Sequence, residues 1–263
     1  MMQVLLAIFR HPELSRLLAF KGGTSLMIFH GLTRFSTDLD FNLLDASKTE
    51  FVYQELHNLL LKFGTIDDEA MKFYGPILVL DYGKGERMLK VEVSNREYPN
   101  HYEIRSLLGT DIRVMTLPDM FAHKLCALGE RITPRDIYDV WFFLQKRTEI
   151  NEEIVQLRTG LPVSEYAMQC AEKVRGYSSR ILMQGLGEVL LDNESKNFAR
   201  QQLIPETASA LELFATYPLI AKLYSNGSSS WPFIVRSRKS RCRCLPYFSA
   251  NVMRVWASAG LGV

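Results

Sequence analysis

The sequence predicts an α+β fold in which strands and helices share the first half of the chain and helices alone follow. Leu39–Leu43 alternates apolar and polar residues, as a half-buried strand does. Further strand candidates lie at residues 73–82, 87–94 and 111–115. From Pro118 onward, apolar residues recur at helical spacing. This order favours a mixed sheet with flanking helices, followed by a helical C-terminal region.

Helices frame the predicted strands. Residues 2–20 carry apolar residues at helical spacing, and Pro12 marks a break within them. Residues 21–25 form a short loop that opens a second helix, which Gly31 ends. A third helix is predicted over residues 48–63. The later helices are predicted at 118–129, 134–147, about 164–190 and 206–224.

The composition is that of an ordinary globular protein and excludes a wholly disordered chain. Of the 263 residues, 47% are hydrophobic and 23% are charged. The net charge of +2 is unevenly distributed, because six basic residues and no acidic one follow Tyr224. Residues 1–225 therefore hold 25 basic against 29 acidic residues, a charge of about −4. The positive net charge is thus no evidence that the folded body binds nucleic acid.

Neither the cysteines nor the apolar start of the chain indicates a special environment. The four cysteines are too few for a disulfide framework at this length, and no second Cys or His pair accompanies Cys242 and Cys244. The apolar start is interrupted by Arg10, His11 and Glu13 and is too short to span a bilayer. We therefore expect a cytoplasmic protein.

A glycine pair marks the first candidate site. In the run Lys21-Gly22-Gly23-Thr24-Ser25, the glycines lead into a helix, where backbone N–H groups can approach phosphate oxygens closely. Thr24 and Ser25 add hydroxyl donors at the same helix start. A lone Gly-Gly is usually only a turn, so this motif needs a second feature to indicate phosphate binding.

That second feature is a pair of acids in the strand that follows. Asp38 and Asp40 are two residues apart, so their side chains point to one face, with Cα atoms about 7 Å apart. Carboxylates at these positions can converge on two magnesium ions about 3.5–4 Å apart. An isolated Asp-x-Asp is usually a solvated surface, but the glycine pair followed by these acids favours a nucleotide site.

The motif GGTSL followed by RFSTDLDF resembles the first motif of the polymerase-β-like nucleotidyltransferase superfamily. More narrowly, it resembles the AbiEii/AbiGii toxin family, the toxins of type IV toxin–antitoxin systems. The resemblance implies the polymerase-β-like mixed sheet. It also implies that Gly22, Gly23, Thr24 and Ser25 bind the nucleotide and that Asp38 and Asp40 are catalytic metal ligands. The implied cofactor is Mg²⁺, as two ions.

Glu92 and Lys124 are further candidates for the active site. Glu92 lies on the polar face of the strand around Leu89–Ser94, where it could complete the metal site, activate the attacking hydroxyl, or simply be solvated. The resemblance favours catalytic and metal-binding roles. Lys124 matches the lysine of the family's helical motif, which implies a contact with phosphate.

The segment from Thr133 to Asp139 matches the family's R-D-x-x-D motif, which implies that Asp136 is catalytic. It also has the features of a helix start, with Thr133 as N-cap, so Asp136 could be only a capping residue. Asp139 is interpreted as structural and could pair with Arg135. Arg34 and Lys21 flank the first motif and are secondary candidates for phosphate contact.

Three parts are expected along the chain. Residues 1–116 form the nucleotidyltransferase α/β core, and residues 117–225 form a helical domain that completes the active site. The N-terminus looks shorter than is usual in the family. Residues 226–263 form a basic tail that opens with a Gly/Ser linker. Interleaved arginines and aromatics could bind RNA there, but the favoured interpretation is a disordered or acquired extension.

The sequence therefore predicts a metal-dependent nucleotidyltransferase that moves an NMP from an NTP to an acceptor hydroxyl. By resemblance, the acceptor is the 3′ end of tRNA or another RNA, or a protein. The expected partner is a cognate antitoxin. The alternative is a catalytically degenerate, nucleotide-binding regulatory protein of the same fold, and a third possibility is an RNA-binding module that depends on the tail.

Overall fold

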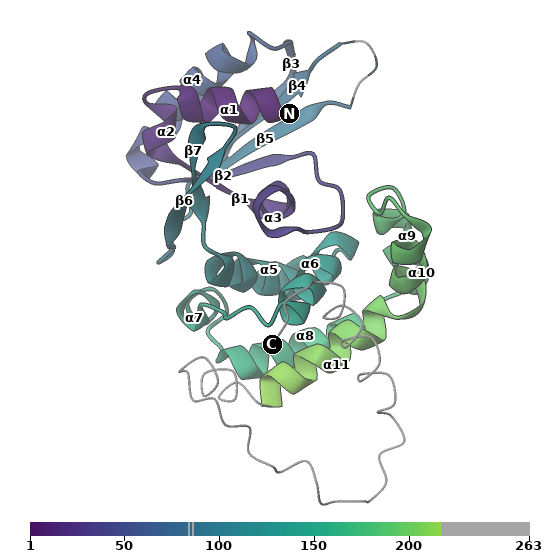
Figure 1. The fold of residues 1–263 in the computed structure, drawn as a ribbon. Helices are drawn as coiled ribbons and strands as arrows, with labels where there is room; N and C mark the ends of the chain where they lie inside the picture. The colour runs from purple at the N-terminus through teal and green to yellow at the C-terminus, as the bar shows by residue number, and fades with distance from the viewer. Residues whose placement is uncertain (84, 86, 217–263) are drawn as a thin grey trace, which may run out of the picture. The chain divides into compact units, whose positions relative to one another are not determined.

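The computed structural model describes residues 1–83, 85 and 87–216. These residues belong to one compact unit, Met1–Leu223 (Figure 1). The predictions for the basic tail fall outside the described residues. The three-part division of the chain stays a prediction.

The core of the first half is a seven-stranded mixed sheet, as the sequence predicted. The strand order is β3-β4-β5-β2-β1-β7-β6, with β2–β5 and β1–β7 parallel and the other neighbours antiparallel. The central strands are buried on both faces. The strands are β1 (Leu18–Lys21), β2 (Leu39–Leu43), β3 (Thr65–Lys72), β4 (Gly75–Asp81), β5 (Leu89–Ser94), β6 (Tyr102–Leu107) and β7 (Thr110–Met115).

Three strands were missed or assigned wrongly from the sequence. Residues 18–21 were predicted as the end of a helix, but they form the buried central strand β1. A short apolar run has too little period to distinguish a strand from a helix. The edge strands β3 and β6 were missed because they are largely exposed and lack a clean apolar alternation. Their pairing with β4 and β7 defines them instead.

Helices cover the two faces of the sheet. Figure 1 shows α1 and α4 on one side and α3 on the side that faces α5 and α6. The predicted break near Pro12 is confirmed, because the first helix ends at Arg10. The helix after the glycine pair starts at Gly22, earlier than predicted. These helices are α1 (Met2–Arg10), α2 (Leu14–Leu17), α3 (Gly22–His30) and α4 (Thr49–Leu60), with a 3-10 turn η1 (Ala46–Lys48) before α4.

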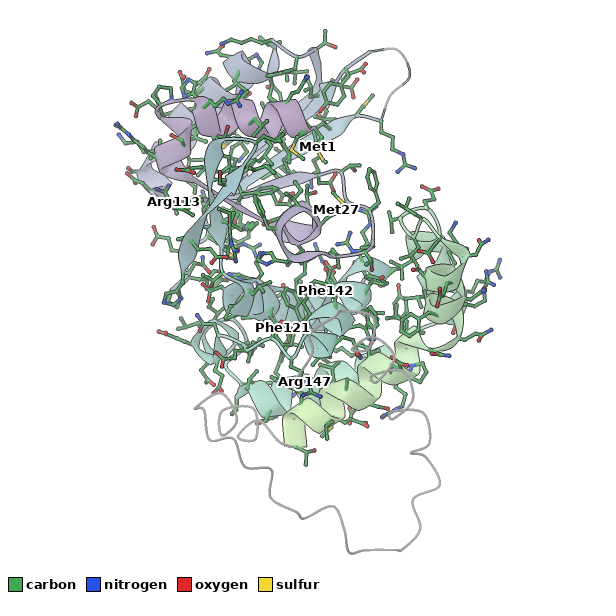
Figure 2. The ribbon with its side chains drawn as sticks, in the orientation of Figure 1. Met1, Met27, Arg113, Phe121, Phe142 and Arg147 are labelled. Carbon is green, nitrogen blue, oxygen red and sulfur yellow. The ribbon has the colours of Figure 1, made fainter. Side chains whose placement is uncertain are left out.

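The second half is helical, as predicted. Phe121 and Phe142 lie where α5 and α6 meet (Figure 2), and both are buried. The long helix predicted over 164–190 is wrong, because Gly176 ends one helix and a second begins at Ser179. The helices are α5 (Leu117–Arg131), α6 (Pro134–Gln145), α7 (Glu152–Thr159), α8 (Val163–Arg175), α9 (Ser179–Leu186), α10 (Asn193–Gln201) and α11 (Leu203–Thr216).

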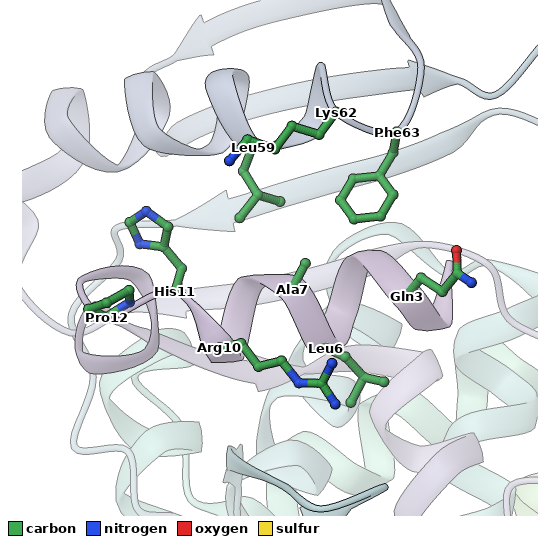
Figure 3. A pocket seen from close by; sticks show the side chains of 9 residues that line it. All are labelled: Gln3, Leu6, Ala7, Arg10, His11, Pro12, Leu59, Lys62 and Phe63. Atoms are coloured by element: carbon green, nitrogen blue, oxygen red, sulfur yellow. The ribbon is translucent and has the colours of Figure 1, made fainter.

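A groove of about 510 Å³ lies between α1 and α4 (Figure 3). Its floor is apolar, with Leu6, Leu59 and Phe63, while Arg10 and Lys62 supply charge. All of the predicted site residues are described, and none of them lines this groove. It is therefore separate from the candidate active site.

Among the described helices, none combines the length and the apolar character that crossing a bilayer requires.

Candidate active site

The glycine turn is built to bring a carboxylate against the start of α3. Gly22 has φ of +81°, in the region that glycine adopts without strain. A Cβ at this position would lie 2.3 Å from Oδ2 of Asp40, so no other residue fits without moving that carboxylate. Asp40 and the glycine turn therefore meet, although 18 positions separate them in the sequence.

Glycine is needed at position 23 as well, because Arg34 and Ser36 lie close to its backbone. A Cβ there would lie 2.6 Å from Nη2 of Arg34 and 2.9 Å from Oγ of Ser36. The loop between α3 and β2 thus packs directly on the first turn of α3. The two glycines thus allow two separate close approaches, that of Asp40 at Gly22 and that of Arg34 and Ser36 at Gly23.

The hydroxyls beside the glycines are buried. Thr24 donates to the backbone carbonyl of Asp38 at 2.5 Å and is hydrogen-bonded to the Ser36 hydroxyl at 3.1 Å. Oγ of Ser25 is buried with no hydrogen-bond partner among the described residues. Thr24 therefore fixes the loop that carries Asp38. The nucleotide-binding roles of Thr24 and Ser25 stay predictions, and Gly22, which is half-buried, is more accessible than either of them.

Three charged residues share one face of the sheet. Asp40 is in register with Lys21 on β1 and with Glu92 on β5. Registered cross-strand neighbours project to the same side, so these side chains form a row across three adjacent strands. Asp38 lies just before β2, two residues from Asp40, and its Oδ2 is 3.9 Å from Nη1 of Arg135.

Burial in this row disfavours the charged forms of Asp40 and Lys21. Burial and the nearby charge of Glu92 raise the pKa of Asp40 above its ordinary value, although Lys124 and Lys21 oppose the shift. Burial lowers the pKa of Lys21 to about 8, even though Asp40 and Glu92 act in the other direction. The charged form of each residue is therefore less favoured than it would be in water. A cation bound beside Asp40 would favour its ionised form and so lower its pKa.

The chemistry of the donor set fits a divalent metal ion. Asp38, Asp40 and Glu92 offer the hard carboxylate oxygens that magnesium prefers, and burial, with a smaller contribution from the charge of Glu92, raises the pKa of Asp40. In the described part of the chain, however, no three His, Cys, Asp or Glu side chains are grouped closely enough to hold a metal as they stand. Lys90 forms an ion pair with Glu92. The carboxylates would have to be drawn together by the ion.

Lys124 and Asp136 form a buried ion pair beside this row. Nζ of Lys124 is 3.2 Å from Oδ1 of Asp136, while Arg131 and Thr133 contact Oδ2 of Asp136 at 3.0 and 2.7 Å. Burial disfavours the charge of Asp136, but Lys124, Arg131 and Thr133 more than offset it and hold its pKa at about 2. A carboxylate this firmly ionised is a poor proton carrier at neutral pH. Its contacts indicate that Asp136 orients Lys124.

The helix start predicted at Thr133 is confirmed. The Thr133 side chain accepts from the backbone N–H of Asp136, and Pro134 occupies the first turn. Asp136 is thus both the residue that Thr133 caps and a partner of Lys124. Its predicted catalytic role remains a prediction.

The predicted pairing of Asp139 with Arg135 is wrong. Asp139 is fully buried and binds Arg34 through two bonds, Nε to Oδ1 at 2.6 Å and Nη2 to Oδ2 at 2.7 Å. Lys124 contacts Oδ2 as well, at 2.7 Å. Arg34 is only 2% exposed, so it is a structural cation and not an accessible phosphate ligand. No local pattern predicts this pair, because its members are 105 residues apart.

A mixed sheet that presents the carboxylates of Asp38, Asp40 and Glu92 beside a glycine turn at a helix start has the arrangement of a nucleotidyltransferase. The chain belongs to the AbiEii family of nucleotidyl transferase toxins of type IV toxin–antitoxin systems, whose family model matches residues 3–212. It is therefore a nucleotidyltransferase, as predicted. Membership implies a nucleotide substrate and an antitoxin partner.

Two solved structures from Helicobacter pylori share the fold, and a third structure is similar with a lower TM-score. The JHP933 protein of Helicobacter pylori is 22% identical, with a TM-score of 0.50 over 86% of this chain and 90% of its own. A putative nucleotidyltransferase of H. pylori is 21% identical, with a TM-score of 0.50 over 86% and 93%. The nucleotidyltransferase toxin MenT4 of Mycobacterium tuberculosis is 18% identical, with a TM-score of 0.45 over 81% and 90%. Comparison with curated proteins gave no match.

Proposed function

We propose that this nucleotidyltransferase moves an NMP from an NTP to an acceptor hydroxyl, using the carboxylates of Asp38, Asp40 and Glu92 beside the glycine turn. The observation that carries the proposal is the contact between the two motifs. Oδ2 of Asp40 lies where a side chain of Gly22 would be, so a phosphate held at the turn would meet the carboxylates directly. A nucleotide bound at one motif is thereby presented to the other.

Each residue has a proposed role. The backbone N–H groups at Gly22 and Gly23, with Thr24 and Ser25 behind them, hold the triphosphate at the start of α3. Asp38, Asp40 and Glu92 would hold magnesium, as two ions. Bound magnesium supplies charge neutralisation at the reacting phosphate and lowers the pKa of a bound hydroxyl. Glu92 is also a candidate to accept the proton of the attacking hydroxyl.

The cations near the row would stabilise phosphate charge. Lys21 lies beside Asp40 in the sheet register, and its pKa of about 8 leaves it largely protonated at pH 7. Lys124 is held by Asp136 and Asp139 within electrostatic range of Asp40. These fixed charges would act without reorganisation at the moment of reaction. The proposed acceptor is the 3′ end of tRNA or another RNA, or a protein, and the proposed partner is a cognate antitoxin.

The test is to incubate the protein with each α-labelled NTP, magnesium, and total cellular RNA and protein. The proposal expects label on one RNA or protein species, and no label with Asp38→Asn or Asp40→Asn. Full transfer by either variant would contradict the assignment. Nucleotide binding measured in parallel separates the alternative, because a regulatory protein of the same fold would bind NTP without releasing pyrophosphate.

A further inference from the structure

We propose that Asp139 is a positioning residue for the nucleotide-binding turn, acting through Arg34. Its consequence for the reaction rests on the proposed function, because it assumes that phosphate binds at the turn. Asp139 belongs to α6 in the helical half of the chain, whereas the turn belongs to the sheet half. The inference therefore assigns the helical half a task in nucleotide binding.

Arg34 and Asp139 are joined by two parallel hydrogen bonds. The two oxygens of Asp139 accept from Nε and Nη2 of Arg34 at 2.6 and 2.7 Å. Two parallel bonds fix the plane of a guanidinium as well as its place, which a single bond to a lysine could not do. Both side chains are buried, so water does not compete for these bonds.

The guanidinium of Arg34 lies against the glycine turn. Nη2 of Arg34 and Oγ of Ser36 lie 2.6 and 2.9 Å from where a Cβ of Gly23 would be. The guanidinium thus fills the space beside the backbone of Gly23 and limits how that backbone can shift. If Asp139 releases Arg34, this support is lost.

The loop that carries Arg34 also carries Asp38, one of the proposed metal ligands. Thr24 holds the carbonyl of Asp38 at 2.5 Å and Ser36 at 3.1 Å. The segment from Arg34 to Asp38 therefore touches the phosphate turn at one end and carries a metal-binding carboxylate at the other. One buried bond pair from α6 fixes both, and an error of about 1 Å at such a site can cost a hundredfold in rate.

The first test compares Asp139→Asn with Phe143→Ala in the full chain. Phe143 lies one turn further along α6 and stacks on Phe121 at 5.0 Å, so its loss destabilises the same helix without touching Arg34. Amide exchange of residues 22–38 and the KM and kcat for each of the four NTPs are measured for both. We expect roughly ten- to a hundredfold faster exchange and a similar rise in KM for Asp139→Asn alone.

Unchanged exchange in residues 22–38, or an equal rise in Phe143→Ala, would overturn the inference. If Asp139→Asn does not fold, Arg34→Lys replaces it, since lysine keeps the charge but cannot form both bonds. Amide exchange needs no turnover, so the two proposals fail separately. Faster exchange in a protein that transfers no label would leave the inference standing and defeat the proposed function.

The second test uses Gly23→Ala. In the natural chain the added methyl would collide with Arg34, so the substitution should raise the amide exchange of residues 22–38. In an Arg34→Ala background the closest neighbour is gone and Oγ of Ser36, at 2.9 Å, remains, so the same methyl should have a smaller further effect. An equal effect in both backgrounds would show that Arg34 does not support the turn.

Discussion

Replacing Asp139 by Asn should destabilise the protein more than almost any other single polar change. Arg34 would keep its charge at 2% exposure, and Lys124 would lose its shorter carboxylate contact, at 2.7 Å. Removing one partner of a buried ion pair costs about 3–5 kcal/mol, because the remaining charge stays desolvated and unpaired. Against a total stability of about 5–15 kcal/mol, this is a large fraction.

Urea unfolding of the full chain, followed by circular dichroism, measures the loss. For a unit of this size, about 3–5 kcal/mol corresponds to a fall in melting temperature of roughly 6–20 °C. The matched control is Glu188→Gln, which breaks the ion pair with Arg87, whose members are 76% and 65% exposed. Exposed pairs contribute less than about 1 kcal/mol, so the control should be almost unchanged.

The double variant Arg34→Met/Asp139→Leu gives a second check on the same reasoning. Apolar residues of similar volume leave no charge buried, so much of the stability lost in Asp139→Asn should return. A loss below about 1 kcal/mol in Asp139→Asn, or a double variant less stable than the single one, would refute the view that this pair is desolvated.

Three further predictions concern the carboxylates and the turn. Asp40→Asn should raise the melting temperature without divalent metal at pH 8, because it removes a charge whose pKa the fold has raised; a lower melting temperature would contradict this. Asp136, with its pKa lowered from 3.8 to about 2, should stabilise the fold above about pH 4 and lose this effect as pH falls toward 2. Acid titration of the stability of wild type against Asp136→Asn checks this, and parallel curves would disprove it. Gly22→Ala should lower both stability and label transfer, since φ is +81° and the methyl meets Asp40. Unchanged melting in that variant would count against the close contact.

Much of the site was visible in the sequence, because its parts lie in local motifs. Gly22 and Gly23 precede a helix, and Asp38 and Asp40 have the spacing of residues on one face of a strand. Both motifs lie within one short segment, so the sequence could predict that the glycine turn and the two acids belong to one site. The alternation of Glu92 with Leu89 and Val91 placed it on the polar face of its strand, and only the resemblance favoured a role for it at the site. The parallel pairing of β2 with β5, which was not predicted, brings it beside Asp40.

The long-range electrostatics could not be predicted in the same way. The capping signature at Thr133 was correct, but Asp139 was expected to pair within its own helix, with Arg135. Its buried partner is Arg34, and its second contact is Lys124 on α5. Such pairs depend on how α6 packs on the loop before β2, and nothing in the local pattern of either segment specifies that packing.

We propose above all that the carboxylates of Asp38, Asp40 and Glu92 and the glycine turn form a centre for nucleotidyl transfer. The most direct measurement supplies one NTP labelled on the α-phosphate and, separately, on the γ-phosphate, with magnesium and cellular RNA and protein. The account predicts that α label enters an acceptor and γ label leaves as pyrophosphate, and that Asp40→Asn abolishes both. Transfer of γ label to the acceptor, or α transfer that survives in Asp40→Asn, would contradict it.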